Sequence, residues 1–117
     1  MAAIMNGIST HILDLTCGRP AAHVAVRLHR YEGGKWRIVA ARRTDVDGRV
    51  TALLPDQEVP QIGFYRLRFG TSGYFRGRGF ESFHPFVDVT FRVRSVDEHY
   101  HVPLLITPHS YSTYRGS

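Results

Sequence analysis

Cysteine is scarce in this sequence of 117 residues, in which Cys17 is the only one. A single thiol excludes an intrachain disulfide and a cluster of thiolate metal ligands. Long hydrophobic runs are also missing, since no apolar stretch approaches the roughly 20 residues that cross a bilayer. Residues 1–7 lack the basic and apolar regions of a secretory signal. We therefore expect a soluble, cytoplasmic protein that has no membrane partner.

Familiar catalytic patterns are absent as well. The sequence has no Gly-x-Ser-x-Gly elbow, no Walker loop, no dinucleotide fingerprint and no His-Glu-x-x-His helix. Paired carboxylates at an interpretable spacing are missing too. Cys17 lies in a Thr-Cys-Gly-Arg-Pro segment that is typical of a turn, which argues against a cysteine nucleophile. Histidine and arginine therefore remain as the main candidates for chemistry.

The net charge of +5 raises the question of a nucleic-acid partner. A basic balance attracts anions of any kind, from phosphate backbones to small acids. Most of the arginines occur singly in strand-like segments. The short cluster of Arg76 and Arg78 has no helix-turn-helix or zinc-finger context. We interpret the arginines as solvated faces of strands and expect no nucleic-acid partner.

Hydrophobic alternation with a period of two dominates the sequence. It occurs at 87–93 (VDVTFRV), at 65–69 (YRLRF) and at 23–29 (HVAVRLH). Successive side chains of a strand point to opposite faces, so each segment predicts a strand with one buried and one wet side. In the third segment, His23 and His29 are expected on the polar face of the strand.

Turn-forming residues separate these segments. Residues 32–34 (EGG) predict a hairpin, and residues 45–48 (DVDG) predict a second turn with Gly48 at positive φ. Residues 71–78 are the one segment that predicts a short helix. Seven or eight short strands in a single domain spanning 1–117 predict an all-β, two-sheet sandwich.

Three histidines stand out as candidate site residues. His99 and His101 form a His-x-His pair that places both rings on one face of a strand. With His11 they could form a catalytic three-histidine zinc site, but no carboxylate that would orient such ligands is evident. A metal-free site is favoured, in which histidine accepts a proton and arginine stabilises negative charge. Arg49, which follows the 45–48 turn, is the candidate arginine, although a lone arginine there is more often a surface residue.

Several segments together resemble the 5-hydroxyisourate hydrolases, the transthyretin-related enzymes of urate degradation. These segments are 9–14 (STHILD), 18–21 (GRPA), 44–49 (TDVDGR), 81–85 (ESFHP), 98–105 (EHYHVPLL) and 114–117 (YRGS). They span nearly the whole chain. The terminal YRGS is the most specific of them, because it separates the hydrolases from the hormone-carrying transthyretins.

The resemblance implies a transthyretin-like β-sandwich that forms a homotetramer, with active sites in a channel between two dimers. The residues that it places in catalysis are His11, Arg49, His101 and Ser117. The residues that it places in substrate binding are His11, Arg49, Tyr114, Arg115, Gly116 and Ser117. The substrate would be a small purine derivative, and no metal or cofactor is implied.

The implied reaction is the hydrolysis of 5-hydroxyisourate to 2-oxo-4-hydroxy-4-carboxy-5-ureidoimidazoline, in the degradation of urate to allantoin. His11 and His101 would deprotonate a water that attacks a cyclic amide carbonyl, while Arg49 stabilises the oxyanion. Three alternatives stay open: a carrier of an apolar ligand on the same scaffold, a zinc-dependent hydrolase and a structural, adhesion-type sandwich. The polar triplet argues against the carrier, since an apolar ligand would leave it desolvated and unpaired.

Overall fold

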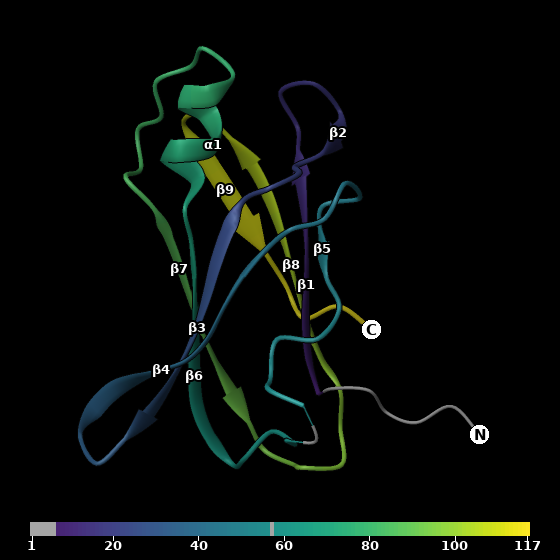
Figure 1. The fold of residues 1–117 in the computed structure, drawn as a ribbon, viewed down its shortest axis with the longest axis vertical. Helices are drawn as coiled ribbons and strands as arrows, with labels where there is room; N and C mark the ends of the chain where they lie inside the picture. The colour runs from purple at the N-terminus through teal and green to yellow at the C-terminus, as the bar shows by residue number, and fades with distance from the viewer. Residues whose placement is uncertain (1–6, 57) are drawn as a thin grey trace.

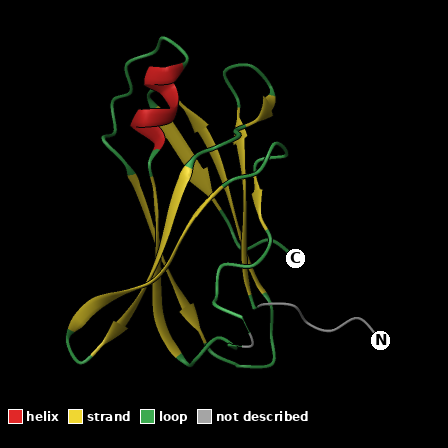
Figure 2. Ribbon diagram, viewed as in Figure 1, coloured by secondary structure: helices red, strands yellow, loops and turns green. Residues whose placement is uncertain are grey.

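The computed structural model describes residues 7–56 and 58–117. They form two β-sheets and one short helix, which confirms the predicted all-β sandwich (Figure 1 and Figure 2). The elements are β1 (Ile8–Asp14), β2 (Arg19–Pro20), β3 (Ala25–Glu32), β4 (Lys35–Arg43), β5 (Arg49–Val50), β6 (Gly63–Phe69), α1 (Thr71–Gly77), β7 (Val87–Val93), β8 (Tyr100–Thr107) and β9 (Ser110–Thr113). The described strands exceed the predicted number because β2 and β5 are too short to show alternation.

The first sheet brings together three segments that are far apart in the sequence. Its strand order is β2-β1-β8-β9, and β5 also pairs with β1. β1 and β8 run parallel, in a register that aligns Ser9 with His101 and His11 with Pro103. β5 runs antiparallel to β1 and aligns Arg49 with His11. Figure 1 shows β1, β5 and β8 together on the right of the molecule.

The second sheet is antiparallel throughout, with the order β4-β3-β6-β7. β3 and β4 form the hairpin predicted at 32–34. Gly33 and Gly34 have φ values of 60° and 79°, as a two-residue turn that matches the twist of its strands requires. The β3–β4 register shifts between Leu28 and His29, an irregularity that the alternation did not predict.

Alternation along the strands decides which side chains fill the core. On β6, Tyr65, Leu67 and Phe69 are between 0 and 2% exposed, as predicted. Ile8 and Ile12 of β1 join the same core and are fully buried. Because neighbouring side chains of a strand point to opposite faces, Ser9 and His11 of β1 lie on the outer side of the first sheet.

The helix α1 lies within the segment predicted to be helical and closes one end of the sandwich, as Figure 2 shows. Phe75 inserts into the core and is 1% exposed. The hydroxyl of the preceding residue, Tyr74, donates a hydrogen bond of 2.7 Å to Oδ2 of Asp14. The helix is thereby fixed to the end of β1.

One predicted strand begins later than the alternation indicated. His23 lies outside β3, which starts at Ala25, and it has a φ of 62°. Thr44 sets this conformation, since its Oγ1 accepts a 2.9 Å hydrogen bond from the amide of Val24 and donates one of 2.7 Å to the carbonyl oxygen of Ala21. The chain therefore turns at His23 instead of extending.

No helix in the described part of the chain is long and apolar enough to span a membrane. Most of the segment that was expected to carry no secretory signal, residues 1–6, lies outside the described residues.

Candidate active site

His11 and Arg49 lie opposite each other on the outer face of the first sheet. Their strands, β1 and β5, pair so that the two residues are in direct register. His11 is half-buried and Arg49 is exposed. Side chains directly opposite on one face of an antiparallel pair are close neighbours. The imidazole and the guanidinium therefore border the same patch of surface.

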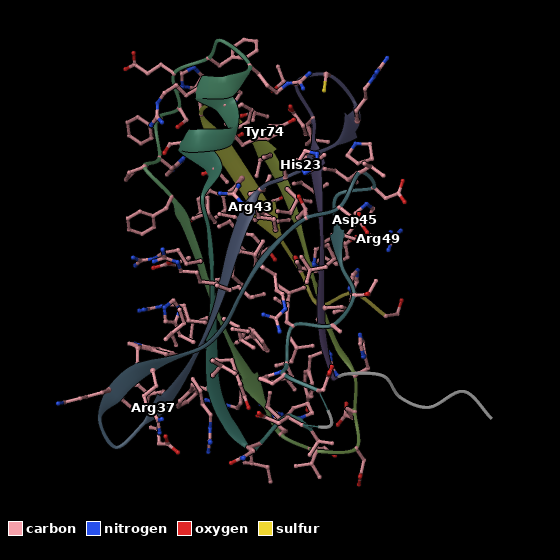
Figure 3. All side chains as sticks on the ribbon, viewed as in Figure 1. His23, Arg37, Arg43, Asp45, Arg49 and Tyr74 are labelled. Atoms are coloured by element: carbon pink, nitrogen blue, oxygen red, sulfur yellow. The ribbon has the colours of Figure 1, made fainter. Side chains whose placement is uncertain are left out.

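The turn before β5 positions Arg49. Oδ1 of Asp45 accepts hydrogen bonds of 2.9 Å from the amides of both Asp47 and Arg49, which fixes the start of the strand. Gly48 has a φ of 74°, and a Cβ at this residue would lie 2.5 Å from the carbonyl oxygen of Ile12. Only glycine fits this close approach. Figure 3 shows the Arg49 side chain directed away from the ribbon, with Asp45 beside it.

His101 reaches the same face from β8. It lies in register with Ser9, whose Oγ is 2.8 Å from Nδ1 of His101. Burial lowers the pKa of the His101 imidazole from its ordinary value of 6.5, and the neighbouring charges of His99, Arg49 and His11 lower it further. His101 is therefore neutral at pH 7 and able to accept a proton. The structure thus brings His11, Arg49 and His101 together.

The end of the chain folds back onto His101. The Gly116 amide donates a 2.8 Å hydrogen bond to the carbonyl oxygen of His101, so the two residues form an isolated β-bridge. A Cβ at Gly116 would lie 2.5 Å from Cδ2 of the His101 ring. Ser117 follows directly and is exposed. In Figure 1 this terminal segment leaves β9 and ends on the β5 side of the sheet.

Tyr114 and Arg115 occupy a different place. Arg115 donates a 2.9 Å hydrogen bond to Oε1 of Glu98, and its guanidinium lies 4.7 Å from the centre of the Tyr100 ring. Tyr114 and Arg115 line a cavity of about 400 Å³ that His101 also borders, together with arginines of and just beyond β7. The terminal YRGS is therefore divided, with Gly116 against the His101 ring and Arg115 held by Glu98.

Comparison with known proteins shows the family of this chain. A family model described as the HIUase/Transthyretin family matches residues 8–116. The chain belongs to the HIUase/Transthyretin family. A curated relative, the 5-hydroxyisourate hydrolase of Caulobacter vibrioides, is 47% identical over 117 residues, which cover 97% of this chain and 100% of that protein.

Solved structures of both branches of the HIUase/Transthyretin family match the fold. The 5-hydroxyisourate hydrolase of Klebsiella pneumoniae has a TM-score of 0.82 and 36% identity, over 94% of this chain and 98% of that chain. Sea bream transthyretin in complex with thyroxine has a TM-score of 0.87 and 32% identity, over 94% of each chain. Because a hydrolase and a thyroxine-bound protein share this sandwich, the fold alone does not determine the activity.

Sequence reasoning missed one residue of this family member's candidate site. Ser9 is 7% exposed, and its Oγ lies 2.7 Å from Nε2 of His99 as well as 2.8 Å from Nδ1 of His101. Ser9 precedes His11 by two residues, which places both on one face of β1. Its contact with His101 depends on the register between β1 and β8, and no pattern within one strand indicates that register.

The described residues do not form the three-histidine zinc site that was one of the alternatives. Within residues 7–56 and 58–117, no three His, Cys, Asp or Glu side chains are grouped so that they could hold a metal ion. His99 and His101 share the Ser9 hydroxyl as a hydrogen-bonding partner.

Proposed function

We propose that this chain hydrolyses 5-hydroxyisourate to 2-oxo-4-hydroxy-4-carboxy-5-ureidoimidazoline in the degradation of urate to allantoin. The observation that carries the proposal is the meeting of His11, Arg49 and His101 on one outer face of the sheet, with Gly116 against the His101 ring. The relatives named 5-hydroxyisourate hydrolase match over nearly the full chain, which supports the same reaction.

The two histidines hold and activate the attacking water. His101 is neutral at pH 7 because its pKa is lowered, so it accepts a proton as water attacks the carbonyl of the cyclic amide. His11 lies on the adjacent strand and fixes the same water from the other side. A general base contributes on the order of 10²–10⁴-fold in rate.

Arg49 is the group that stabilises the developing negative charge. The N–H groups of its planar guanidinium can donate paired hydrogen bonds to the oxygens of a flat, polar, readily anionic purine derivative. The Asp45 turn holds the backbone of Arg49 before substrate arrives, so little reorganisation is needed as the oxyanion forms. Ser117 completes the catalytic set and, with Gly116, positions the substrate or the water. Tyr114 and Arg115 contact the substrate from the cavity that they share with His101.

We also propose a cytoplasmic homotetramer of single-domain chains, with this face lining a channel between dimers. Leu15 and Val46 support a covered face. They are 55% and 73% exposed, and they lie in the turns that follow β1 and precede β5. Multi-angle light scattering measures the mass in solution, and a monomer would contradict this assembly.

A substrate-decay assay tests the proposed function. Freshly generated 5-hydroxyisourate is followed by its ultraviolet absorbance with wild type, with His101→Ala and without protein. We expect wild type to accelerate the decay and to keep doing so after chelator treatment, which excludes the zinc alternative. Decay at the spontaneous rate, combined with tight binding of thyroxine, would instead support the carrier.

A further inference from the structure

The Ser9 hydroxyl lies between two imidazole rings. Its Oγ is 2.7 Å from Nε2 of His99 and 2.8 Å from Nδ1 of His101. Ser9 is 7% exposed, so its hydroxyl has little access to solvent. The parallel pairing of β1 with β8 places Ser9 directly opposite His101, which makes the contact a consequence of the strand register.

The three groups form a continuous chain of hydrogen bonds from the site to solvent. A hydroxyl donates one hydrogen bond and accepts others, so Ser9 can accept from one ring while it donates to the other. With Nδ1 of His101 bound to Ser9, Nε2 is the nitrogen left to face the reacting water. His101 is half-buried, whereas His99, at the other end of the chain, is exposed.

The terminal segment fixes the outer end of this chain. Arg115 donates hydrogen bonds to Oε1 of Glu98, at 2.9 Å, and to the carbonyl oxygen of His99, at 3.4 Å. Gly116 holds the backbone of His101 in the same way. Both histidines therefore keep their place relative to Ser9 through contacts with the last residues of the chain.

The proposed reaction, on which this inference rests, releases one proton per turnover. Water adds to the carbonyl carbon and the C–N bond breaks, so one proton of the water goes to the leaving ring nitrogen. The other proton stays on the new carboxylic acid, which ionises near neutral pH because carboxyl groups have pKa values near 4. That proton has to pass from the half-buried His101 to solvent.

We infer that His101, Ser9 and His99 form a proton relay that carries this proton from the site to solvent. Nε2 of His101 takes the proton as Nδ1 gives its own to Oγ of Ser9, which passes its hydrogen to Nε2 of His99. His99 then releases the proton on its Nδ1 to buffer. Each group gains and loses one proton. The rings regain their starting tautomers by exchange with water after the product leaves.

His99 and Ser9 act in this scheme through His101 and do not touch the substrate. Their loss should therefore slow proton release and leave the earlier steps intact. The expected signature is a decrease in kcat with a parallel decrease in KM, so that kcat/KM changes little. A defect in folding or in substrate binding would lower kcat/KM as well.

The test compares wild type with His99→Ala in stopped-flow hydrolysis at low and high concentrations of imidazole buffer. His99 is exposed, so the variant should fold normally. We expect kcat of His99→Ala to fall about ten-fold or more at low buffer, given that a positioned proton-transfer group contributes on the order of 10²–10⁴-fold. Added imidazole should restore it, because the buffer then accepts the proton from Ser9 in place of His99.

Two further variants complete the experiment. His109→Ala removes another exposed histidine, one outside the relay, and should behave as wild type at every buffer concentration. Ser9→Ala should lower kcat, and Ser9→Thr, which retains a hydroxyl, should recover much of it.

A His99→Ala enzyme with wild-type kcat at low buffer would overturn the relay while leaving the hydrolase intact. A slow His99→Ala enzyme that imidazole does not restore would overturn it equally. Wild type that fails to accelerate decay would refute the proposed function and the relay with it.

Discussion

Gly116 lies against the imidazole ring of His101, and its amide donates a 2.8 Å hydrogen bond to the carbonyl oxygen of the same residue. Two residues that are 15 positions apart thus share one small volume, in which a side chain at Gly116 would overlap the ring. His101 cannot easily give way, because Ser9 holds its Nδ1 from the other side. The penultimate residue of the chain therefore sets the position of the proposed base.

Gly116→Ala should displace the end of the chain or the His101 ring. The added Cβ would lie 2.5 Å from Cδ2 of the ring and 3.2 Å from Cγ of Pro103. A misplacement of about 1 Å at a reacting group can cost about 10²-fold in rate, so we expect a loss of kcat/KM of that order with little change in thermal stability. Gly73→Ala is the matched control, since a Cβ there meets no atom within 4 Å. Wild-type activity in Gly116→Ala would separate the terminal segment from the mechanism.

Arg49→Met should abolish most of the activity without unfolding the protein. The guanidinium is exposed, and Arg49 takes part in the Asp45 turn through its backbone amide and carbonyl, so the substitution keeps the turn and removes the charge. The loss of an oxyanion donor costs roughly 10²–10³-fold in kcat. Arg27→Met removes an exposed arginine from the other sheet and should retain full activity. Equal losses in the two variants would point to net charge as the cause.

The lowered pKa of His101 predicts where activity fails in acid. The neutral imidazole is the active form, so kcat/KM should fall as the pH drops through the folded-state pKa, which lies below 6.5. The unfolded chain takes up this proton near pH 6.5 and the folded chain only at lower pH. The associated stability is therefore complete above pH 6.5 and is lost as the pH falls towards the folded-state value.

Nuclear magnetic resonance titration of the His101 ring measures this pKa directly. In Arg49→Met it should rise towards 6.5, because the guanidinium charge that opposes the imidazolium is gone. A His101 pKa above 6.5 in wild type would contradict the assignment of a neutral base.

Alternation predicted the features of this fold that depend on neighbouring residues. Tyr65, Leu67 and Phe69 are buried as expected, because the two faces of a strand follow directly from its geometry. The turn at 32–34 and the helix at α1 follow equally local rules. Local patterns also indicated the outer position of Arg49, since glycine and aspartate define the turn before it.

Contacts between distant segments account for what the sequence did not reveal. His23 leaves the strand because Thr44, on a remote segment, bonds the backbone around it. Ser9 joins the site only because β1 and β8 pair in one particular register. The division of the YRGS end, with Arg115 on Glu98, likewise depends on where two segments meet. Such contacts depend on the whole fold and produce no periodic pattern in the sequence.

Tyr74→Phe should destabilise the junction of α1 with β1. The Asp14 carboxylate is 1% exposed and accepts hydrogen bonds from the Tyr74 hydroxyl, at 2.7 Å, and the Thr16 amide, at 2.9 Å. Burial raises the pKa of Asp14, but these bonds outweigh it and hold the pKa below 3.8. Leaving one buried acceptor site unmatched costs about 1–3 kcal/mol, which urea unfolding at pH 7 measures.

The pH dependence of the stability lost in Tyr74→Phe distinguishes a broken hydrogen bond from a packing defect. Asp14 stabilises the fold fully above pH 3.8, and this contribution is lost as the pH falls through its folded-state pKa. The difference in the free energy of unfolding between wild type and Tyr74→Phe should therefore decrease in acid. Tyr31→Phe is the control, because Tyr31 is 44% exposed and its removal should change stability little. A gap that stays constant with pH would indicate lost packing alone.

Gly48→Ala should destabilise the protein more than an equivalent change at Gly18. Both glycines have positive φ, 74° at Gly48 and 71° at Gly18, and a left-handed alanine costs roughly 1–2 kcal/mol at either one. Gly48 bears a second cost, since its Cβ would lie 2.5 Å from the carbonyl oxygen of Ile12, whereas a Cβ at Gly18 meets nothing within 4 Å. The Gly48 carbonyl also accepts a 2.8 Å hydrogen bond from the Ile12 amide, so β5 cannot move away without breaking its pairing with β1.

We expect Gly48→Ala to lower the melting temperature more than Gly18→Ala does. Gly48→Ala should also reduce activity, because His11 and Arg49 separate when β5 shifts. Equal melting temperatures in the two variants would show that the turn relaxes freely and does not fix the position of Arg49.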